Sequence, residues 1–211
     1  MTSTRLLRVH PGNPQRVALE EATGVLLKGG LVAFPTETFY GLGANALDPA
    51  AVRRIFEVKG RPESKPLLLL VDSIEMAESL VKEVSAAARD LMAKHWPGPL
   101  TLIFRAIPSL PDELTAGTGT VGIRVPRHPV AFELVRAAGL PITAPSANRS
   151  GEEPPATAAD VQRVFGGKIE LILDGGATTG GLPSTILDVT VTPPKLIRRG
   201  ALEFPDITEV D

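Results

Sequence analysis

The chain has 211 residues, of which 43% are hydrophobic and 22% charged, and its formal net charge is −2. These values are typical of a globular protein with a real core, and they confine any anion or nucleic-acid site to a local patch. The absence of cysteine excludes disulfides, thiol catalysis and thiolate metal sites and fits a cytoplasmic protein. No apolar stretch approaches the roughly 18 residues of a membrane span.

The first quarter of the sequence predicts two helices separated by a strand and a loop. A helix is expected from Asn13-Pro14 to Gly29-Gly30, followed by a short buried strand at residues 31–34. Residues 35–43 are then expected to form a long polar loop that contains glycine. Ligand sites in open α/β sheets favour such positions directly after a strand. A second helix is expected to begin at Asp48-Pro49, with Asp48 as its cap.

Three cations, Lys59, Arg61 and Lys65, lie within seven residues on the connection between this second helix and the next strand. Gly60 and Pro62 do not allow the helix to continue through this loop. The loop can therefore direct several positive charges at one anion, and arginine adds a planar two-pronged donor. A solvated basic loop is the alternative, and for an isolated motif of this kind it is the more common outcome.

The rest of the sequence intermixes helices and strands without a repeat or a linker. This pattern predicts one α/β domain over residues 1–211, with a twisted mixed sheet flanked by helices. Residues 108–119 are expected to form a loop and are the candidate for closing over a site. Strands are expected at residues 67–71, 100–104, 121–125, 141–144, 169–173, 183–189 and 195–198, and helices at residues 74–80, 85–95, 129–138 and 158–165.

Cationic and hydroxyl side chains gather at the ends of these predicted elements. The set consists of Thr36, Thr38, Lys59, Arg61, Lys65, Thr120, Arg124, Ser146, Asn148, Ser184 and Arg198. It suits the binding of a polyanion and a small polar molecule, with catalysis by positioning and charge stabilisation. Structural alternatives exist for each residue. Arg124 could pair with a core carboxylate, and Ser146 and Asn148 could shape a turn.

Several common catalytic motifs are absent or misplaced. The letters of residues 41–46 match the dinucleotide-binding pattern G-x-G-x-x-G/A. The predicted strand before them ends too early for such a site, and the next predicted helix begins only at Asp48. There is no P-loop and no nucleophile elbow around Ser146. His10, His95 and His128 share no metal-ligand spacing, so we expect no zinc site. Glu37, the one acid of the first loop, could orient backbone as easily as take part in chemistry.

Six motifs nevertheless occur in a specific order from residue 29 to about residue 200. They are residues 29–43, the K-x-R triplet at 59–61, residues 96–101, residues 121–126, the S-x-N triplet at 146–148, and residues 184–186. With these motifs the chain resembles the YrdC-like threonylcarbamoyl-adenylate synthase family. The resemblance covers nearly the whole chain, with a motif-bearing core at about residues 14–200, and six ordered motifs make it far more specific than any single one.

The resemblance implies a reaction in which threonine and bicarbonate form a carbamate that attacks the α-phosphate of ATP. The products are pyrophosphate and threonylcarbamoyl-AMP, which other proteins use to modify an adenosine in tRNA. The matching motifs imply that Lys59 and Arg61 are catalytic and that, together with Lys65, they hold the triphosphate. The nucleotide would also contact Thr120, Ser146, Asn148 and Arg198. The threonine site would comprise Thr36, Thr38, Arg124 and Ser184. Mg²⁺ is expected with ATP, without a dedicated metal site in the protein.

Two departures from the family pattern stand out. Many members carry a histidine on the threonine side of the site where this chain has Leu70. Longer members add a C-terminal domain, so the resemblance implies a single-domain form here. The alternative function is an RNA-binding paralogue without synthase activity, using the same basic face on tRNA or double-stranded RNA. Net negative charge and an aromatic content of 4% count against a dedicated RNA binder.

Overall fold

The computed structural model describes residues 3–205 and 207, which form a mixed α/β fold. The strands are β1 (Arg5–Arg8), β2 (Val32–Pro35), β3 (Tyr40–Gly43), β4 (Leu68–Leu70), β5 (Leu100–Arg105), β6 (Thr120–Arg124), β7 (Ile142–Thr143), β8 (Leu171–Asp174), β9 (Thr185–Asp188) and β10 (Lys195–Arg198). The helices are α1 (Arg16–Leu27), α2 (Pro49–Lys59), α3 (Ile74–Ser79), α4 (Ala86–His95), α5 (Asp112–Thr115), α6 (Pro129–Ala138) and α7 (Ala158–Phe165). In this described part of the chain, no helix is long and apolar enough to cross a membrane.

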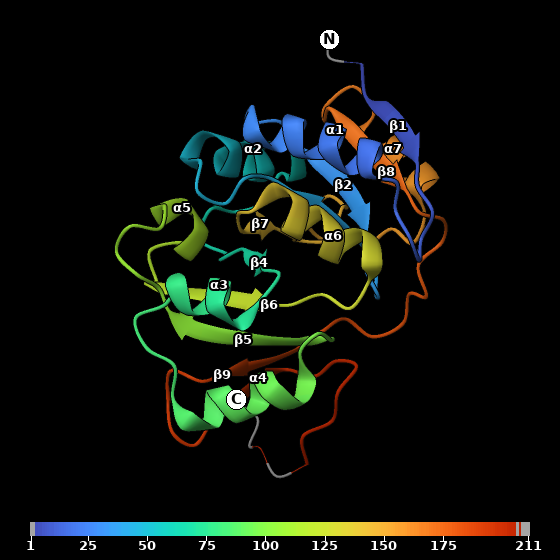
Figure 1. Ribbon diagram of the computed structural model, residues 1–211. Helices are drawn as coiled ribbons and strands as arrows, with labels where there is room; N and C mark the ends of the chain where they lie inside the picture. The colour runs from blue at the N-terminus through green and yellow to red at the C-terminus, as the bar shows by residue number, and fades with distance from the viewer. Residues whose placement is uncertain (1–2, 206, 208–211) are drawn as a thin grey trace.

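The strands divide into two sheets, and both sheets are mixed. One has four strands in the order β1-β8-β2-β3, and the other has six in the order β10-β9-β5-β6-β4-β7. Figure 1 shows the first sheet with α1 and α7 in the upper half of the molecule, and the second sheet with α3 and α4 in the lower half. The prediction of a mixed sheet flanked by helices is confirmed, with the difference that the strands form two sheets.

The segment after β2 is a β-hairpin, so the prediction of a loop over residues 35–43 was wrong in its second half. Strand β3 runs antiparallel to β2, with Val32 opposite Gly43 and Pro35 opposite Tyr40. Glycine is depleted in strands, which is why the sequence suggested a loop. Here a Cβ on Gly43 would lie 2.7 Å from the ring of Phe34 and 2.8 Å from Ile142. The glycines therefore allow Phe34 and the neighbouring chain to approach the strand closely.

The segment 141–148 joins the two sheets. Isolated bridges pair Gly41 with Ser146 and Asn45 with Ile142, which ties this segment to the β3 side. On its other side the Ala144 N–H donates to the Leu68 carbonyl, and β7 pairs with β4. Because one short stretch of chain bonds to both sheets, the polar side chains that it carries lie between them.

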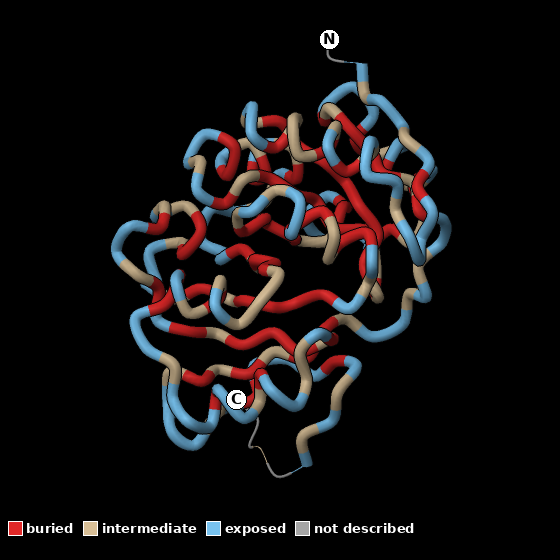
Figure 2. The backbone as a smooth tube through the Cα atoms, in the orientation of Figure 1, coloured by how far each residue is buried: buried red, intermediate tan, exposed pale blue. Residues whose placement is uncertain are grey.

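The core consists of two clusters of buried apolar residues. The larger one includes residues of both sheets together with α2, α3, α4 and α7, of which α7 contacts β2 and β8. The smaller one packs α1 and α6 against β2 and β8. Figure 2 shows the inner strands largely buried, with exposed residues mainly on turns and the outer faces of helices. The edge strands β1 and β10 are mostly exposed. The strands consequently form a rigid frame from which loops can present functional groups.

Helix α2 begins and ends as the sequence predicts. The Asp48 side chain accepts a hydrogen bond from the Ala50 N–H at 2.9 Å, and Gly60 ends the helix in the left-handed conformation with φ 57°. Its buried face consists of Ala51, Val52, Ile55, Phe56 and Lys59. Helix α1 begins at Arg16, slightly later than expected, and the edge strand β1 was not predicted.

We predict that His128 makes stability depend on pH. Its Nδ1 caps α6 by accepting a hydrogen bond from the Val130 N–H at 3.2 Å, which requires an unprotonated nitrogen. Burial lowers the pKa of His128 below its usual value, an effect that the Glu37 carboxylate partly offsets. As the pH falls, the unfolded chain therefore binds this proton before the folded protein does. The stabilisation by the His128 cap is full above about pH 6.5 and is lost progressively below it.

Urea unfolding at pH 7.5, 6.5 and 5.5 tests this expectation. His128→Asn keeps a good N-cap but does not titrate, so its free energy of unfolding should fall less than that of the wild type across this range. Equal losses in the two proteins would contradict the prediction.

Candidate functional site

A cavity of about 620 Å³ lies between the two sheets. Its walls come from the β2–β3 turn, the loop before β4, strands β5 and β6, the segment 144–146, and the C-terminal segments around Ser184 and Arg198. Volumes of 300–1,000 Å³ are typical of pockets for small molecules and cofactors. The cavity therefore has the size and the position expected of a binding site.

Most of the residues predicted from the sequence meet in this cavity. Those that line it are Thr36, Thr38, Arg61, Thr120, Arg124, Ser146, Ser184 and Arg198. They come from six separate stretches of chain, so the fold brings together what the sequence holds far apart. Three predicted residues, Lys59, Lys65 and Asn148, do not line the cavity.

Lys59 lies buried directly behind the wall that carries Ser146. Its Nζ donates hydrogen bonds to the backbone carbonyls of Ser146 and Asn148, and its own carbonyl accepts from the Ser150 N–H. Burial, with a smaller contribution from the nearby charge of Arg61, lowers the pKa of Lys59 to about 8. The side chain thus holds the S-x-N loop in place and brings a positive charge close to it.

The other two cations of the loop differ in position. The Arg61 guanidinium reaches the cavity wall while it donates to the carbonyls of Lys65 and Pro66 at 3.2 Å and 2.9 Å. These bonds fold the loop back on itself and fix the direction of the guanidinium. The Lys65 side chain is exposed.

Asn148 shapes a turn, which is the structural alternative considered from the sequence. Its Nδ2 donates to the carbonyls of Arg149 and Glu152 at 2.8 Å and 2.7 Å. The Oδ1 atom is buried and has no hydrogen-bond partner among the described residues.

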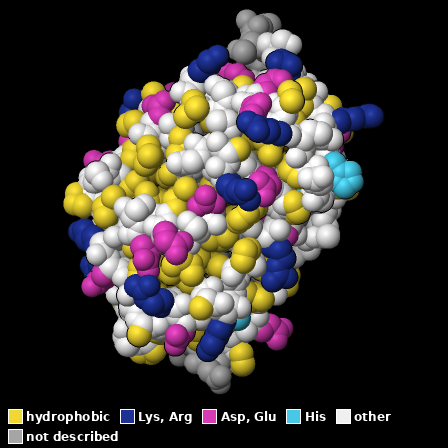
Figure 3. All heavy atoms as spheres, viewed as in Figure 1, with side chains coloured by type: hydrophobic (Ala, Val, Ile, Leu, Met, Phe, Trp, Pro, Cys, Tyr) yellow, Lys and Arg dark blue, Asp and Glu magenta, His cyan; other side chains and the backbone are white. Residues whose placement is uncertain are grey.

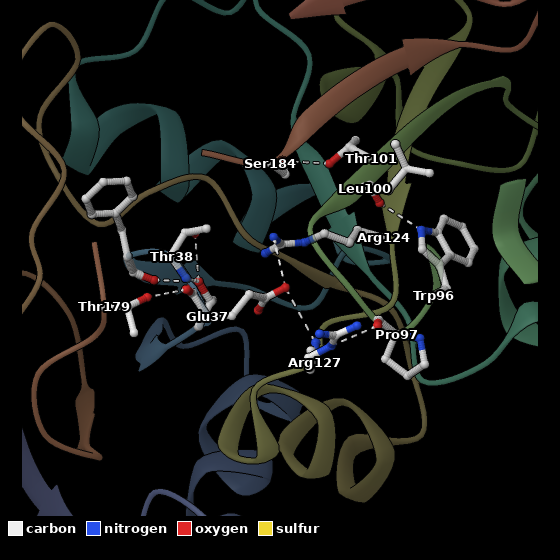
Figure 4. Close-up of polar contacts among 12 residues, drawn as sticks. Glu37, Thr38, Trp96, Pro97, Leu100, Thr101, Arg124, Arg127, Thr179 and Ser184 are labelled. Carbon is white, nitrogen blue, oxygen red and sulfur yellow. Dashed lines mark hydrogen bonds and ion pairs between the residues drawn. The ribbon is translucent and has the colours of Figure 1, made fainter. Parts of the chain in front are cut away.

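Arg124, at the end of β6, is the most deeply buried cation of the cavity wall. Its side chain is 4% exposed, and its Nη1 lies 3.3 Å from the Oε1 atom of the half-buried Glu37 carboxylate, so it pairs with an acid as one alternative from the sequence allowed. Burial lowers the pKa of Arg124, and the Glu37 carboxylate counteracts this effect. Figure 4 shows the Glu37 side chain directed from the β2–β3 turn toward Arg124.

A second polar group lies across the cavity on the C-terminal segments. The Arg198 guanidinium donates to the Ser184 carbonyl and to the Ser184 Oγ atom, at 2.7 Å and 3.1 Å. Ser184 Oγ lies 2.9 Å from Oγ1 of Thr101, and both hydroxyls are buried (Figure 4). Burial, and then the charge of Arg124, lowers the pKa of Arg198. Two arginines therefore share this end of the cavity.

Sequence reasoning missed two polar residues at the site. Thr101 lines the cavity next to Ser184, and its place on a strand directly after a Pro-Gly-Pro turn was a usable signal. Tyr40 also lines the cavity, and its hydroxyl donates to the Gly176 carbonyl at 2.7 Å. Burial raises the pKa of Tyr40, so it remains a neutral hydrogen-bonding group.

The structure also shows where Leu70 and the candidate closing loop lie. Leu70 is fully buried with Phe34 and Ile142 in the smaller core cluster and does not line the cavity. Residues 108–119, the candidate closing loop, contain the short helix α5 and contribute nothing to the lining. Gly181, Pro183 and Ser184 line the cavity instead, so the end of the loop before β9 lies at its edge.

The charges and hydroxyls define what the cavity can hold. Among the residues that the structure describes, its lining includes three arginines and no acidic residue, which favours anionic ligands. The hydroxyl groups can orient a small polar molecule. Within residues 3–205 and 207, no group of three or more histidine or acidic side chains is arranged to hold a metal ion.

The chain is similar to known proteins over most of its length. A family model described as "Telomere recombination", for the Sua5, YciO and YrdC proteins, matches residues 24–200. The chain is 49% identical over 189 residues to a threonylcarbamoyl-AMP synthase of Pyrococcus abyssi, and 44% identical over 193 residues to one of Bacillus subtilis. These alignments cover 90% and 91% of this chain but 56% of each relative. The chain thus spans about half the length of the curated relatives it matches.

Solved structures agree with this relationship. The Sua5 protein of P. abyssi in complex with L-threonine superposes with a TM-score of 0.91 at 46% identity, over 94% of this chain and 58% of that one. The YciO protein of E. coli superposes with a TM-score of 0.87 at 28% identity, over 95% of this chain and 97% of that one. The family model, the sequence identities and the shared fold together show that this chain belongs to the Sua5/YciO/YrdC family.

Proposed function

We propose that the chain is an L-threonylcarbamoyladenylate synthase, which makes threonylcarbamoyl-AMP and pyrophosphate from L-threonine, bicarbonate and ATP. The observation that carries this proposal is the gathering of Arg61, Arg124 and Arg198 with hydroxyl side chains in one cavity of about 620 Å³. Relatives named threonylcarbamoyl-AMP synthase and a related structure in complex with L-threonine support it.

We assign the triphosphate to the end of the cavity formed by the K-x-R loop. Arg61 would contact phosphate oxygens directly, because this residue lines the cavity. Lys59 would act from behind: two of its N–H groups bond to carbonyls, and the third has no partner among the described residues. Lys65 is exposed and would reach the outermost phosphate.

We assign the remainder of the nucleotide to residues on both sides of the cavity. Ser146 and Thr120 line it and can bond to the nucleotide through their hydroxyls, and Arg198 would add a positive charge. Asn148 would contribute by shaping the S-x-N loop, with its unpartnered Oδ1 available after a small movement.

The threonine would lie at the end of the cavity where Arg124 is buried. Arg124 can bind a carboxylate with two parallel hydrogen bonds. Thr36 and Thr38, on the β2–β3 turn, and Ser184, across the cavity, supply hydroxyls for the other polar groups of the amino acid. This placement directs the amino group of threonine toward the region assigned to the nucleotide.

Catalysis in this arrangement rests on positioning and charge. The threonine amine and bicarbonate form a carbamate, with loss of water. A carbamate oxygen then bonds to the α-phosphorus of ATP, and the bond from that phosphorus to the bridging oxygen of pyrophosphate breaks. Lys59 and Arg61 would stabilise the charge on the leaving pyrophosphate. The nucleophile belongs to the substrate, so no catalytic triad is needed.

Three further features of the proposal concern the surroundings of the reaction. We expect Mg²⁺ to be held by phosphate oxygens and water, because the described residues offer no cluster of acidic ligands. The product would pass in the cytoplasm to proteins that transfer the threonylcarbamoyl group to tRNA. The face in Figure 3 intermixes basic and acidic side chains, so it offers no broad basic surface for RNA.

The decisive measurement is pyrophosphate release. We expect release only when ATP, L-threonine and bicarbonate are all present, with threonylcarbamoyl-AMP detectable by mass spectrometry. Release at the same rate without threonine, or none with the three substrates, would contradict the synthase proposal. Tight binding of tRNA or double-stranded RNA by a protein that releases no pyrophosphate would favour the RNA-binding alternative.

Arg61→Ala should impair ATP use and leave the KM for L-threonine unchanged. We expect kcat/KM for ATP to fall by roughly 10- to 100-fold, with a rise in the KM for ATP as part of the loss, because charge-assisted hydrogen bonds to phosphate are worth about 1.5–3 kcal/mol. The matched control is Arg53→Ala, which removes an exposed arginine that pairs with Glu113 on the outside of α2. An unchanged KM for ATP in Arg61→Ala would remove this residue from the triphosphate site.

Lys59 should make ATP use sensitive to pH. Because the pKa of Lys59 is about 8, its charge is present below that pH and is lost above it. The KM for ATP should therefore rise between pH 7 and pH 9, by up to about tenfold for each pH unit above the pKa. Lys59→Gln can still donate to the two carbonyls, and its KM should be high and independent of this ionisation. Parallel pH profiles for the two proteins would rule out this role.

A further inference from the structure

We propose that Glu37 is a positioning residue, which orients the Arg124 guanidinium so that it can receive the carboxylate of the amino-acid substrate. The inference rests on the proposed function and adds to it a residue to which that function assigns no role. Glu37 lies between Thr36 and Thr38 in sequence, but unlike them it does not line the cavity. Any effect of Glu37 on the substrate must therefore pass through a neighbour.

The neighbour is Arg124, and the contact between the two side chains is buried. Their Nη1 and Oε1 atoms lie 3.3 Å apart, with 4% of the arginine and 16% of the glutamate side chain exposed. This separation is longer than the 2.7–2.9 Å of a strong charge-assisted hydrogen bond. The pair is thus close enough to hold the arginine in place without using up its capacity to bind an anion.

Both members of the pair retain unused hydrogen-bonding capacity. Arg124 Nε and Glu37 Oε2 are buried and have no hydrogen-bond partner among the described residues. A buried arginine with unused donors at a cavity wall is suited to bind a carboxylate. Glu37 lies away from the cavity, so it fixes one side of the guanidinium and leaves the other side to the ligand.

Glu37 is itself held from two directions. Its Oε1 lies 3.5 Å from the Arg127 backbone N–H, and its carbonyl accepts from the Thr179 hydroxyl at 2.8 Å. The Arg127 side chain continues the network by donating to the Pro97 carbonyl at 3.3 Å. Figure 4 shows the Glu37 carboxylate between Arg124 and Arg127. The carboxylate therefore has a defined position from which it can set the direction of the arginine.

The charges give a second reason for this role. Arg124 is buried, and its charge contributes to lowering the pKa of Arg198. Two uncompensated guanidinium groups would repel each other and favour a shift of Arg124 away from the cavity. With Glu37 present, the three groups carry a net charge of +1 instead of +2, which reduces the repulsion on Arg124.

The test compares steady-state kinetics of pyrophosphate release in Glu37→Ala and Glu37→Gln. Glu37→Ala should raise the KM for L-threonine about tenfold and leave kcat and the KM for ATP within about threefold of wild type, because only the threonine carboxylate loses its aligned partner. Glu37→Gln keeps an oxygen that can accept from Arg124 and Arg127. Because this variant loses the charge that offsets the two arginines, its KM for L-threonine should still rise, by about threefold, and stay well below that of Glu37→Ala.

A double-mutant cycle tests whether Glu37 acts through Arg124. Arg124→Ala alone should raise the KM for L-threonine at least as much as Glu37→Ala, and adding Glu37→Ala to it should have no further effect. The control is Glu133→Ala, which removes an acid that pairs with Arg136 on the surface of α6 and should leave all constants unchanged. Thermal unfolding of each variant reports on folding, and Glu37→Gln serves if Glu37→Ala does not fold.

The possible results distinguish a failure of the proposed function from a failure of the positioning role of Glu37. If wild-type protein shows no threonine-dependent pyrophosphate release, the proposed function fails and the role of Glu37 fails with it. If wild type is active, two results for Glu37→Ala would overturn the positioning role alone. One is an unchanged KM for L-threonine, and the other is a fall in kcat with equal rises in the KM values of both substrates. Independent effects of the two substitutions in the double mutant, or a tenfold rise of this KM in a folded Glu37→Gln protein, overturn it as well.

Discussion

The buried ammonium group of Lys59 is the constraint on which the arrangement of the cavity depends. A buried cation is costly unless it is hydrogen-bonded, and Lys59 meets this requirement with the carbonyls of Ser146 and Asn148. These carbonyls lie far along the chain, in the segment that bonds to both sheets. The end of α2 is thereby fixed to the wall between the sheets, and the S-x-N loop cannot move independently of the K-x-R loop.

The opposite end of the cavity follows from a second buried charge. Arg124 ends a central strand of the six-stranded sheet, while Glu37 comes from the turn of a hairpin in the four-stranded sheet. Their contact makes the relative placement of the two sheets part of the geometry of the site. Arg198, bonded to Ser184, completes a group in which two cations face one anion. An anionic ligand is expected to stabilise such a group.

The predictions made from the sequence were most accurate where local rules decide the structure. The Asp48 cap, the end of α2 at Gly60 and the helix at residues 158–165 were all confirmed, because caps and glycine stops act within a few residues. The loop predicted over residues 35–43 was partly wrong, because Gly41 and Gly43 in β3 serve a close approach of Phe34 and Ile142. That approach depends on residues distant in sequence, so no local rule contains it.

The sequence by itself determined the α/β class, most helices and strands, and the set of cations and hydroxyls from which the site is built. Periodicity, capping and turn chemistry are encoded locally, and the ordered motifs carry the family resemblance. The tertiary structure decided which way those side chains point. It turned Lys59 away from the cavity toward two carbonyls, used Asn148 to shape a turn, and gave Glu37 a partner in Arg124. These outcomes depend on burial and on contacts between distant segments, since a buried charge must find its partner wherever the fold places one.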